Sequence, residues 1–415
     1  MEKENHNIKF LLMNLLLTIY GIEIVFPPVT TVLNSNIICM LCLLGWIIIS
    51  FFTDSGYYLC QNIRNTYPLI FYFATAVIPY LFGIGVIGNR YLSLGLIPVG
   101  YIIFNYYKQK KRLSDLKRIS IIIAFFATIT FFITLKALIE DPYISRSIKS
   151  SGEHSENLAR YGIGGYSFIY FIAVVSVFLL YMSLKSKSKW FRCITFIGYL
   201  MSLYFVLKSN YMTALLTVVM ASVVLVISYY AEASPTKGVK LFFITVLALV
   251  ILMNINAIVN KYADFIPKRI ASVLVLESGV RIYQSILDEF VNDRWPTMLS
   301  SIKMLLSHPF FGMVSSNDIQ MSQSGGLTGF GQHSHILDTF ALYGFVIGIV
   351  NIFIIFKPFK DHNGKRIKYG KALNNAMLVC TIVIYLFNNA TPSIAFAFGI
   401  LFPLLREVYD SGCQT

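Results

Sequence analysis

Charged residues are scarce in this sequence, and their scarcity excludes a soluble globular protein. Asp, Glu, Lys and Arg make up 13% of the 415 residues, whereas 56% of the residues are hydrophobic. Soluble domains carry roughly 25% charged and about 45–50% apolar residues. Apolar runs of about 20 residues, the length of a helix that crosses a bilayer, recur along nearly the whole chain. The composition therefore indicates an all-α integral membrane protein.

Cysteines are also few, and their positions do not suggest a disulfide framework. All six lie in predicted spans or in loops predicted to be cytoplasmic, where thiols stay reduced. They are Cys39, Cys42, Cys60, Cys193, Cys380 and Cys413. The N-terminal residues MEKENHNIKF precede an apolar run without a small-residue cleavage site, so we expect the first span to be retained.

The positive net charge of +14 does not indicate nucleic-acid binding. The basic residues form short clusters between spans, as cytoplasmic loops beside anionic lipid do. These clusters are KQKKRLSDLKR (108–118), KSKSKWFR (185–192) and KPFKDHNGKRIKYGK (357–371). We therefore expect membrane lipids and no nucleic acid as partners.

The hydrophobic pattern predicts about 12 transmembrane helices with both termini in the cytoplasm. Their expected ranges are 8–26, 35–52, 67–87, 91–107, 119–139, 165–184, 192–208, 210–230, 240–260, 336–356, 372–388 and 391–408. The chain then divides into a transmembrane region over 1–260, a large extracytoplasmic loop over 261–335 and the C-terminal spans over 336–415.

Two predicted outer loops are long, and loops of more than about 15 residues in a compact protein are usually functional or disordered. The smaller covers about 140–164, and the larger is 261–335. Within the larger loop, PTMLSSIKMLLSHP (296–309) predicts a short amphipathic helix that begins near Pro296. Its apolar face comprises Met298, Leu299, Ile302, Leu305 and Leu306. Such a helix either lies along the membrane surface or packs on the spans.

Three positive residues on the predicted outer side suit the binding of phosphate: Arg160, Lys208 and Arg281. Each also has a simpler interpretation. Arg160 and Arg281 are equally consistent with anchoring to lipid headgroups, and Lys208 at a span end is typical of a snorkelling lysine.

Three histidines follow in the large loop. His333 and His335 form an H-x-H pair, and a histidine can take a proton from a hydroxyl near neutral pH. The pair and Asp338 also suggest a metal site, but a further strong ligand and outer cysteines are missing, so we expect neither metal nor cofactor. His308 before Pro309 is interpreted as the end of a helix.

These residues resemble the shared C-terminal region of the O-antigen ligase/polymerase superfamily of bacterial envelope proteins. The matching parts are Arg281, then HPFFG at 308–312, then HSHILDTFALYGFVIG at 333–348. The turn KSNYMTALL at 208–216 corresponds loosely to another motif of that family, although it has Lys208 and Asn210 and no arginine.

The resemblance implies a GT-C-like helical fold in the bacterial plasma membrane, with glycosyl transfer at the outer face. The donor would be an oligosaccharide on undecaprenyl pyrophosphate. By the same resemblance, His333 would be the base and His335 the reserve base, whereas Arg281, Arg160 and Lys208 would bind the pyrophosphate. A protein that regulates chain length is a further implied partner.

Within the family, Ser334 after His333 and the segment RIYQS favour a Wzy-type polymerase, which joins lipid-linked repeat units of O-antigen or capsule. Three alternatives stay open. The first is an O-antigen ligase that transfers glycan to lipid A–core. The others are a flippase or transporter of lipid-linked glycan and a non-catalytic assembly factor.

Overall fold

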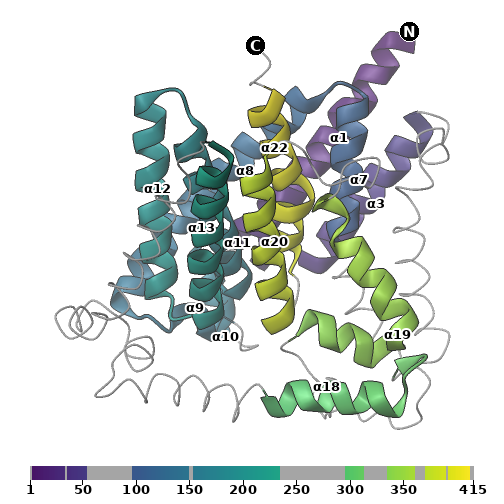
Figure 1. Ribbon diagram of the computed structural model, residues 1–415. Coiled ribbons are helices and arrows are strands. Elements are labelled where there is room, and N and C mark those ends of the chain that lie inside the picture. The colour runs from purple at the N-terminus through teal and green to yellow at the C-terminus, as the bar shows by residue number, and fades with distance from the viewer. Residues whose placement is uncertain are drawn as a thin grey trace. The chain divides into compact units, whose positions relative to one another are not determined.

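The computed structural model describes residues 2–32, 35–53, 96–148, 153–233, 295–312, 334–359, 370–388 and 391–411. Every regular element in these ranges is helical, as predicted (Figure 1). The elements are α1 (Glu2–Val25), α2 (Pro27–Val32), α3 (Ser35–Thr53), α7 (Leu96–Gln109), α8 (Leu113–Glu140), α9 (Ile144–Ser147), α10 (Glu153–Arg160), α11 (Tyr166–Lys185), α12 (Lys189–Lys208), α13 (Met212–Ala233), α18 (Trp295–Ser307), α19 (His335–Ile355), η3 (Lys357–Phe359), α20 (Lys371–Phe387), α21 (Pro392–Phe396), η4 (Ala397–Leu401) and α22 (Phe402–Ser411).

Seven helices within the described ranges are long and apolar enough to cross a membrane, so the chain is a multi-pass membrane protein. They are Asn7–Val25, Leu113–Glu140, Tyr166–Lys185, Lys189–Lys208, Met212–Glu232, His335–Phe359 and Pro392–Tyr409. Helices α3 and α20 coincide with two further predicted spans but have shorter apolar segments. The predicted spans 67–87 and 240–260 lie outside the described residues, so the total of about 12 stays a prediction.

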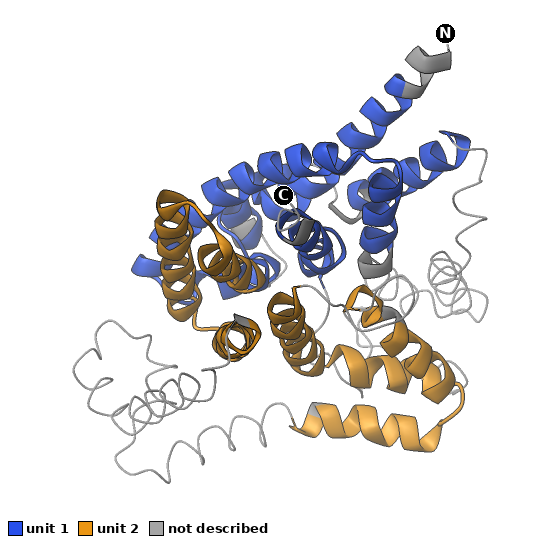
Figure 2. Cartoon of the chain, turned by 45° about the horizontal axis from the view of Figure 1, so that its top comes forward, with its two compact units in different colours: residues 1–171, 391–415 blue, residues 172–390 orange. Residues whose placement is uncertain are grey.

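Backbone contacts divide the chain into two compact units (Figure 2). Unit 1 comprises residues 1–171 and 391–415, and unit 2 comprises residues 172–390, so the boundary lies inside α11. The predicted division into 1–260, 261–335 and 336–415 stays a prediction, because most of its middle part lies outside the described residues.

Within unit 1, α1 and α8 lie side by side and run in the same direction. Just before α8, Arg112 Nη2 donates a hydrogen bond to Asn7 Oδ1 at 3.0 Å. Five turns further along both helices, Thr130 Oγ1 donates to the carbonyl oxygen of Val25 at 2.8 Å. The first and fifth spans of the predicted topology run parallel in this way.

Other helices of unit 1 run toward the end at which α1 and α8 begin. Phe52, near the end of α3, accepts a hydrogen bond from Lys9 Nζ at 3.2 Å. Lys108, near the end of α7, forms an ion pair with Glu407 in α22. Because the basic segment 108–118 also lies here, we call this the basic end of unit 1. The predicted topology likewise has the second, fourth and last spans running in one direction, opposite to that of the first and fifth.

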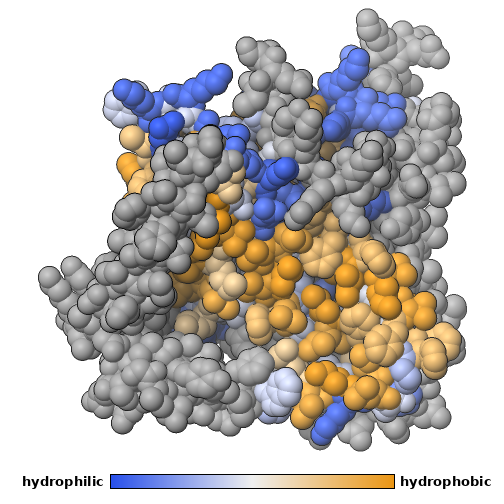
Figure 3. All heavy atoms as spheres, in the orientation of Figure 1, coloured by the Kyte–Doolittle hydropathy of each residue, from blue (hydrophilic) through white to orange (hydrophobic). Residues whose placement is uncertain are grey.

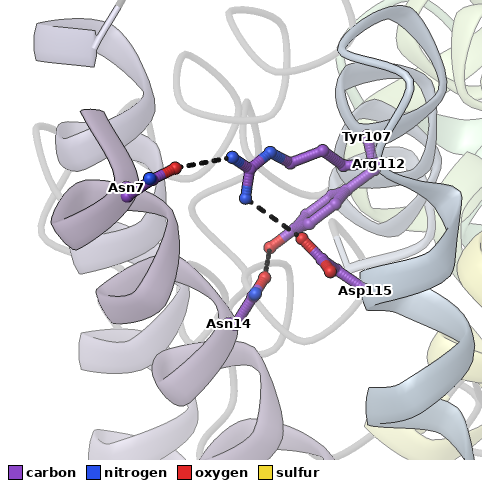
Figure 4. A network of polar contacts seen from close by, with 5 residues as sticks. All are labelled: Asn7, Asn14, Tyr107, Arg112 and Asp115. Carbon is purple, nitrogen blue, oxygen red and sulfur yellow. Dashed lines mark hydrogen bonds and ion pairs between the residues drawn. The ribbon is translucent and has the colours of Figure 1, made fainter. Parts of the chain in front are cut away.

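A polar network fixes the start of α1 against the α7–α8 hairpin at the basic end (Figure 4). Tyr107 Oη donates to Asn14 Oδ1 at 2.6 Å, and the ring of Tyr107 is fully buried. The guanidinium of Arg112 bonds Asn7 at 3.0 Å and Asp115 Oδ2 at 3.3 Å. Every bond in this network is made by a side chain.

Unit 2 is built on the antiparallel pair α13 and α20. Asn375 Nδ2, at the start of α20, donates to Ser228 Oγ near the end of α13 at 3.1 Å. The two helices pack along their lengths. Because the start of α20 lies beside the end of α13, they run in opposite directions. Helix α12 packs on α13, where Tyr199 Oη bonds Ser222 Oγ at 3.2 Å. Helix α18 packs on α19 and lies crosswise to α13 and α20 (Figure 1).

Candidate functional site

The candidate site lies around the head of α19, where the motif HSHILDTFALYGFVIG begins. Ser334 is the N-cap of this helix: its side chain accepts a hydrogen bond from the backbone N–H of Leu337 at 3.2 Å. The backbone N–H of Asp338 donates to the carbonyl oxygen of Ser334 at 2.8 Å. The helix therefore begins one residue before the predicted span 336–356, and the cap satisfies N–H groups that a helix start leaves without partners.

His335 is held inside unit 2 by its backbone and by an aromatic neighbour. Its backbone N–H donates to the carbonyl oxygen of Asn388, just after α20, at 3.1 Å. Its imidazole is 2% exposed, and its centroid lies 4.8 Å from the ring centroid of Tyr385. Neither ring nitrogen has a hydrogen-bond partner among the described residues. The imidazole of His335 is therefore packed inside unit 2, and its role as reserve base stays a prediction.

A chain of buried polar groups continues from His335 along α19. Thr339 Oγ1 donates to the carbonyl oxygen of His335 at 2.7 Å and accepts from Asn351 Nδ2 at 3.2 Å. Asp338 Oδ1 accepts a hydrogen bond from Ser301 Oγ of α18 at 2.8 Å. All of these residues are at least nine-tenths buried. Buried polar groups in a membrane protein are costly, so such a chain marks a functional or a specifying element.

The bond between Asn351 and Thr339 is possible because α19 is sharply bent at Gly344. Residues 12 apart in a straight helix are separated by about 18 Å. Gly344 has φ of 75° and ψ of −174°, a conformation that is essentially restricted to glycine. The predicted span 336–356 is therefore present as two half-helices, and not as one straight helix.

The segment HPFFG fills the bend in α19 and completes its hydrogen bonding. The backbone N–H of Phe345 donates to the carbonyl oxygen of Pro309 at 2.7 Å. A Cβ atom on Gly344 would lie 2.2 Å from the carbonyl oxygen of Phe310, which is far inside van der Waals contact. Glycine is thus required at 344 both by its backbone conformation and by the neighbouring backbone.

Gly312 makes the reciprocal contact from the other side. Its φ is 61°, and a Cβ atom there would lie 2.4 Å from the carbonyl carbon of Leu342 and 2.5 Å from the backbone nitrogen of Tyr343. We call the contact between 309–312 and 342–345 the glycine clasp. It brings together the two stretches of sequence on which the family resemblance chiefly depends.

His308 lies at the junction of α18 and the clasp. Helix α18 ends at Ser307, the N–H of His308 donates to Met304, and the carbonyl oxygen of His308 accepts from Gly312 at 2.9 Å. Pro309 has no N–H with which to continue the helix. His308 therefore occupies the helix-ending position that the sequence predicted.

Lys208 lies at the same end of unit 2 as His335. It is the last residue of α12, and its Nζ is 5.9 Å from the ring centroid of Tyr204. Asn210 follows with φ of 57° in the turn before α13. Because α13 and α20 are antiparallel and packed along their lengths, this turn lies beside the end of α20, to which His335 is bonded.

Arg160 belongs to unit 1, at the end opposite its basic end. Helix α8 runs from the basic end for 28 residues, about 42 Å. Near its far end, Thr134 Oγ1 accepts from the N–H of Gly164, just after α10. Arg160 ends α10 and is 60% exposed, with its guanidinium 3.9 Å from Glu156. The charge of Arg160 is therefore accessible to an anion.

His333 and Arg281, the predicted base and one predicted phosphate ligand, lie outside the described residues. His333 directly precedes the N-cap Ser334 in the sequence. Within the described ranges, no group of three or more His, Cys, Asp or Glu side chains could hold a metal ion.

No protein-family model matches this chain. The search of curated proteins finds no match either. The assignment of a function therefore depends on the residue patterns and on the geometry described above.

Several residues at this site were missed by sequence reasoning. Asn388, Tyr385 and Ser301 contact the head of α19 from segments far away in the sequence. Asn351 alone had a usable signal, because it is an amide within an apolar run, and polar residues inside spans are rare and usually paired.

Proposed function

We propose that this protein is a polysaccharide polymerase at the outer face of the bacterial plasma membrane. It would transfer a glycan from undecaprenyl pyrophosphate to the end of an acceptor repeat unit that is itself lipid-linked. The observation that carries the proposal is the glycine clasp, because HPFFG and the entry of α19 are separate motifs of the family and here form one packed unit. Gly312 and Ser334, which precede and follow the sequence segment that contains His333, thereby belong to one packed element.

The proposed chemistry needs no nucleotide at the outer face. A hydroxyl of the acceptor attacks the anomeric carbon of the donor glycan, and the bond from that carbon to the pyrophosphate oxygen breaks. His333 would remove the proton of the attacking hydroxyl. Arg281, Arg160 and Lys208 would bind the pyrophosphate and stabilise the charge that develops as it leaves.

The exposed guanidinium of Arg160 supports part of this assignment. The guanidinium of Arg160 lies 3.9 Å from the carboxylate of Glu156, and both side chains are more than half exposed. Such an ion pair is weak, so a phosphate can replace Glu156 at little cost. The buried imidazole of His335 supports His333 as the base, because a base must reach the proton that it removes.

The glycan profile of a strain that lacks this gene tests the proposal. We expect glycan limited to one repeat unit, with long chains restored by the wild-type gene. His333→Ala and Arg281→Ala should reduce chain formation about 10²–10⁴-fold at normal protein levels, the usual contribution of acid–base or charge-stabilising groups. His362→Ala, in a predicted cytoplasmic loop, is the matched control and should restore full chains.

Each other outcome identifies an alternative. Long lipid-linked chains that never reach a final acceptor would indicate a ligase. Single repeats that stay on the inner leaflet would indicate a flippase. Full-length chains in both His333→Ala and Arg281→Ala would exclude the assigned catalytic roles.

A further inference from the structure

An exposed apolar edge follows α18 into the turn after it. Leu306, at the end of α18, is 69% exposed, and Phe310 and Phe311 in the turn are 69% and 67% exposed. Around the helix from Leu306, Met298 and Ser301 are buried against α19. The helix therefore uses one side to pack on unit 2 and leaves a row of large apolar side chains without protein cover.

The polar residues of α18 lie on a separate side of the helix. Trp295 and Leu306 are 11 residues apart, close to three full turns, so both project from the same apolar side. Lys303 and Ser307 are four residues apart and share another side, where both are exposed. An exposed helix with one apolar and one polar side is typical of a segment that lies in the interface of a bilayer.

The apolar edge continues into the exposed stripe of the second half of α19. The bond from Phe345 to the carbonyl oxygen of Pro309 places the turn beside the start of that stripe. The stripe comprises Phe345, Val346, Ile349 and Phe353, which follow the i, i+1, i+4, i+8 pattern of one helix side and are each 44–61% exposed. Figure 3 shows apolar residues gathered over the part of unit 2 where α19 lies.

We propose that α18 and the turn 308–312 form an in-plane segment in the interfacial layer of the bilayer. Leu306, Phe310 and Phe311, which we call the lipid edge, lie among the acyl chains, and Lys303 and Ser307 face the headgroups and water. The partner is bilayer phospholipid, because the lipid edge is continuous with the exposed stripe of a span in a multi-pass membrane protein.

The glycine clasp gives the lipid edge its place in the membrane. Phe310 and Phe311 lie within the clasp itself, where their backbone is fixed against Gly344 in the bend of α19. The clasp therefore holds the turn 308–312 and α19 at a common depth in the bilayer. This inference concerns lipid alone and does not depend on the proposed glycosyl transfer.

Photocrosslinking of the full-length protein in lipid nanodiscs tests the proposal. Benzoylphenylalanine is placed at position 307, 310 or 353, one position per variant. Each variant is irradiated, and its adducts are identified by mass spectrometry. Position 353, in the α19 stripe, reports a span surface, and position 307, which directly follows Leu306 but lies on the polar side of α18, is the matched control. We expect phospholipid adducts at 310 and 353, with at least tenfold fewer at 307.

Three results would overturn the proposal. The first is lipid adducts at 353 but none at 310, or none at either position. The second is a crosslink from 310 to a second copy of the chain, which would assign the edge to self-association. The third is an adduct at 310 only with an added polyprenyl phosphate, which would assign it to an isoprenoid ligand.

Phe311→Trp supplies a second measurement that does not need a photoreactive residue. Its fluorescence, after subtraction of the emission of the wild-type tryptophans, should be quenched by lipids brominated near the headgroup end of the acyl chain. Stronger quenching by aqueous iodide than by brominated lipid would contradict an interfacial position.

Discussion

The basic end of unit 1 and the head of α19 in unit 2 hold helices together by different means. At the basic end, each of the polar contacts described above is made by at least one side chain, and Arg112, Asp115 and Lys108 are all partly exposed. At the head and the bend of α19, the decisive contacts are between backbones, from His335 to Asn388 and from Phe345 to Pro309. A side-chain network can adjust to a substitution by rotamer changes, whereas two backbones that touch at glycines cannot. Substitutions should therefore be least tolerated at the head of α19.

The largest effect is expected from Gly344→Ala. The new Cβ atom would lie 2.2 Å from the carbonyl oxygen of Phe310, on a backbone conformation that costs about 1–3 kcal/mol for a residue other than glycine. We expect the free energy of unfolding to fall by about 3 kcal/mol or more. The measurement is the midpoint of an SDS unfolding titration of the purified full chain, which should move to a lower SDS fraction. Gly312→Ala should behave alike.

Gly198→Ala in α12 is the matched control for the clasp variants. Its Cβ atom would contact the side chain of Leu179 at an ordinary 3.4 Å within a regular helix. It should leave stability unchanged or raise it by up to about 1 kcal/mol. An equal loss from all three substitutions would show that the clasp has no special role.

An intermediate effect is expected where a side chain joins α18 to α19. Ser301→Ala removes the hydrogen bond that Asp338 accepts at 2.8 Å inside the protein and should cost about 1–3 kcal/mol. In a double-mutant cycle with Asp338→Ala, which removes the acceptor, the two losses of unfolding free energy should be less than additive by about 1 kcal/mol. Strict additivity of the unfolding free energies would mean that the bond contributes nothing.

The smallest effect is expected at the basic end. Arg112→Gln breaks a part-exposed contact with Asp115 at 3.3 Å and should cost no more than about 1 kcal/mol, with a difference from wild type that shrinks as salt is added. Tyr107→Phe, which removes the buried bond to Asn14, should cost about 1 kcal/mol at any salt concentration. A larger loss for Arg112→Gln than for Gly344→Ala would reverse the comparison between the two regions.

The sequence predicted the position of most helices because apolar runs set them. The predicted spans 165–184 and 192–208 agree with α11 and α12 to within a few residues. Helix α8 begins at Leu113 and not at 119, because its first turns contain Lys117 and Arg118, which hydropathy counts as loop although they continue the helix. Hydropathy thus locates spans but not the ends of helices that extend beyond the apolar layer.

The arrangement of the site was less predictable, because it depends on contacts between distant segments. Gly344 and Gly348 both stood in the quoted motif, and nothing local to α19 distinguished the one at which the helix bends. The bend is decided by the backbone at Pro309 and Phe310, more than 30 residues earlier in the chain. The burial of His335 likewise depends on Tyr385 and Asn388, which follow it by some 50 residues.

The hydrogen bond between Pro309 and Phe345 closes the intervening chain into a ring. In polymer terms, the entropy of closing a loop grows only with the logarithm of its length, so doubling the number of residues in the ring costs about 0.6 kcal/mol. Insertions and deletions between Gly312 and Ser334 therefore have little effect on the closure that joins α18 to α19.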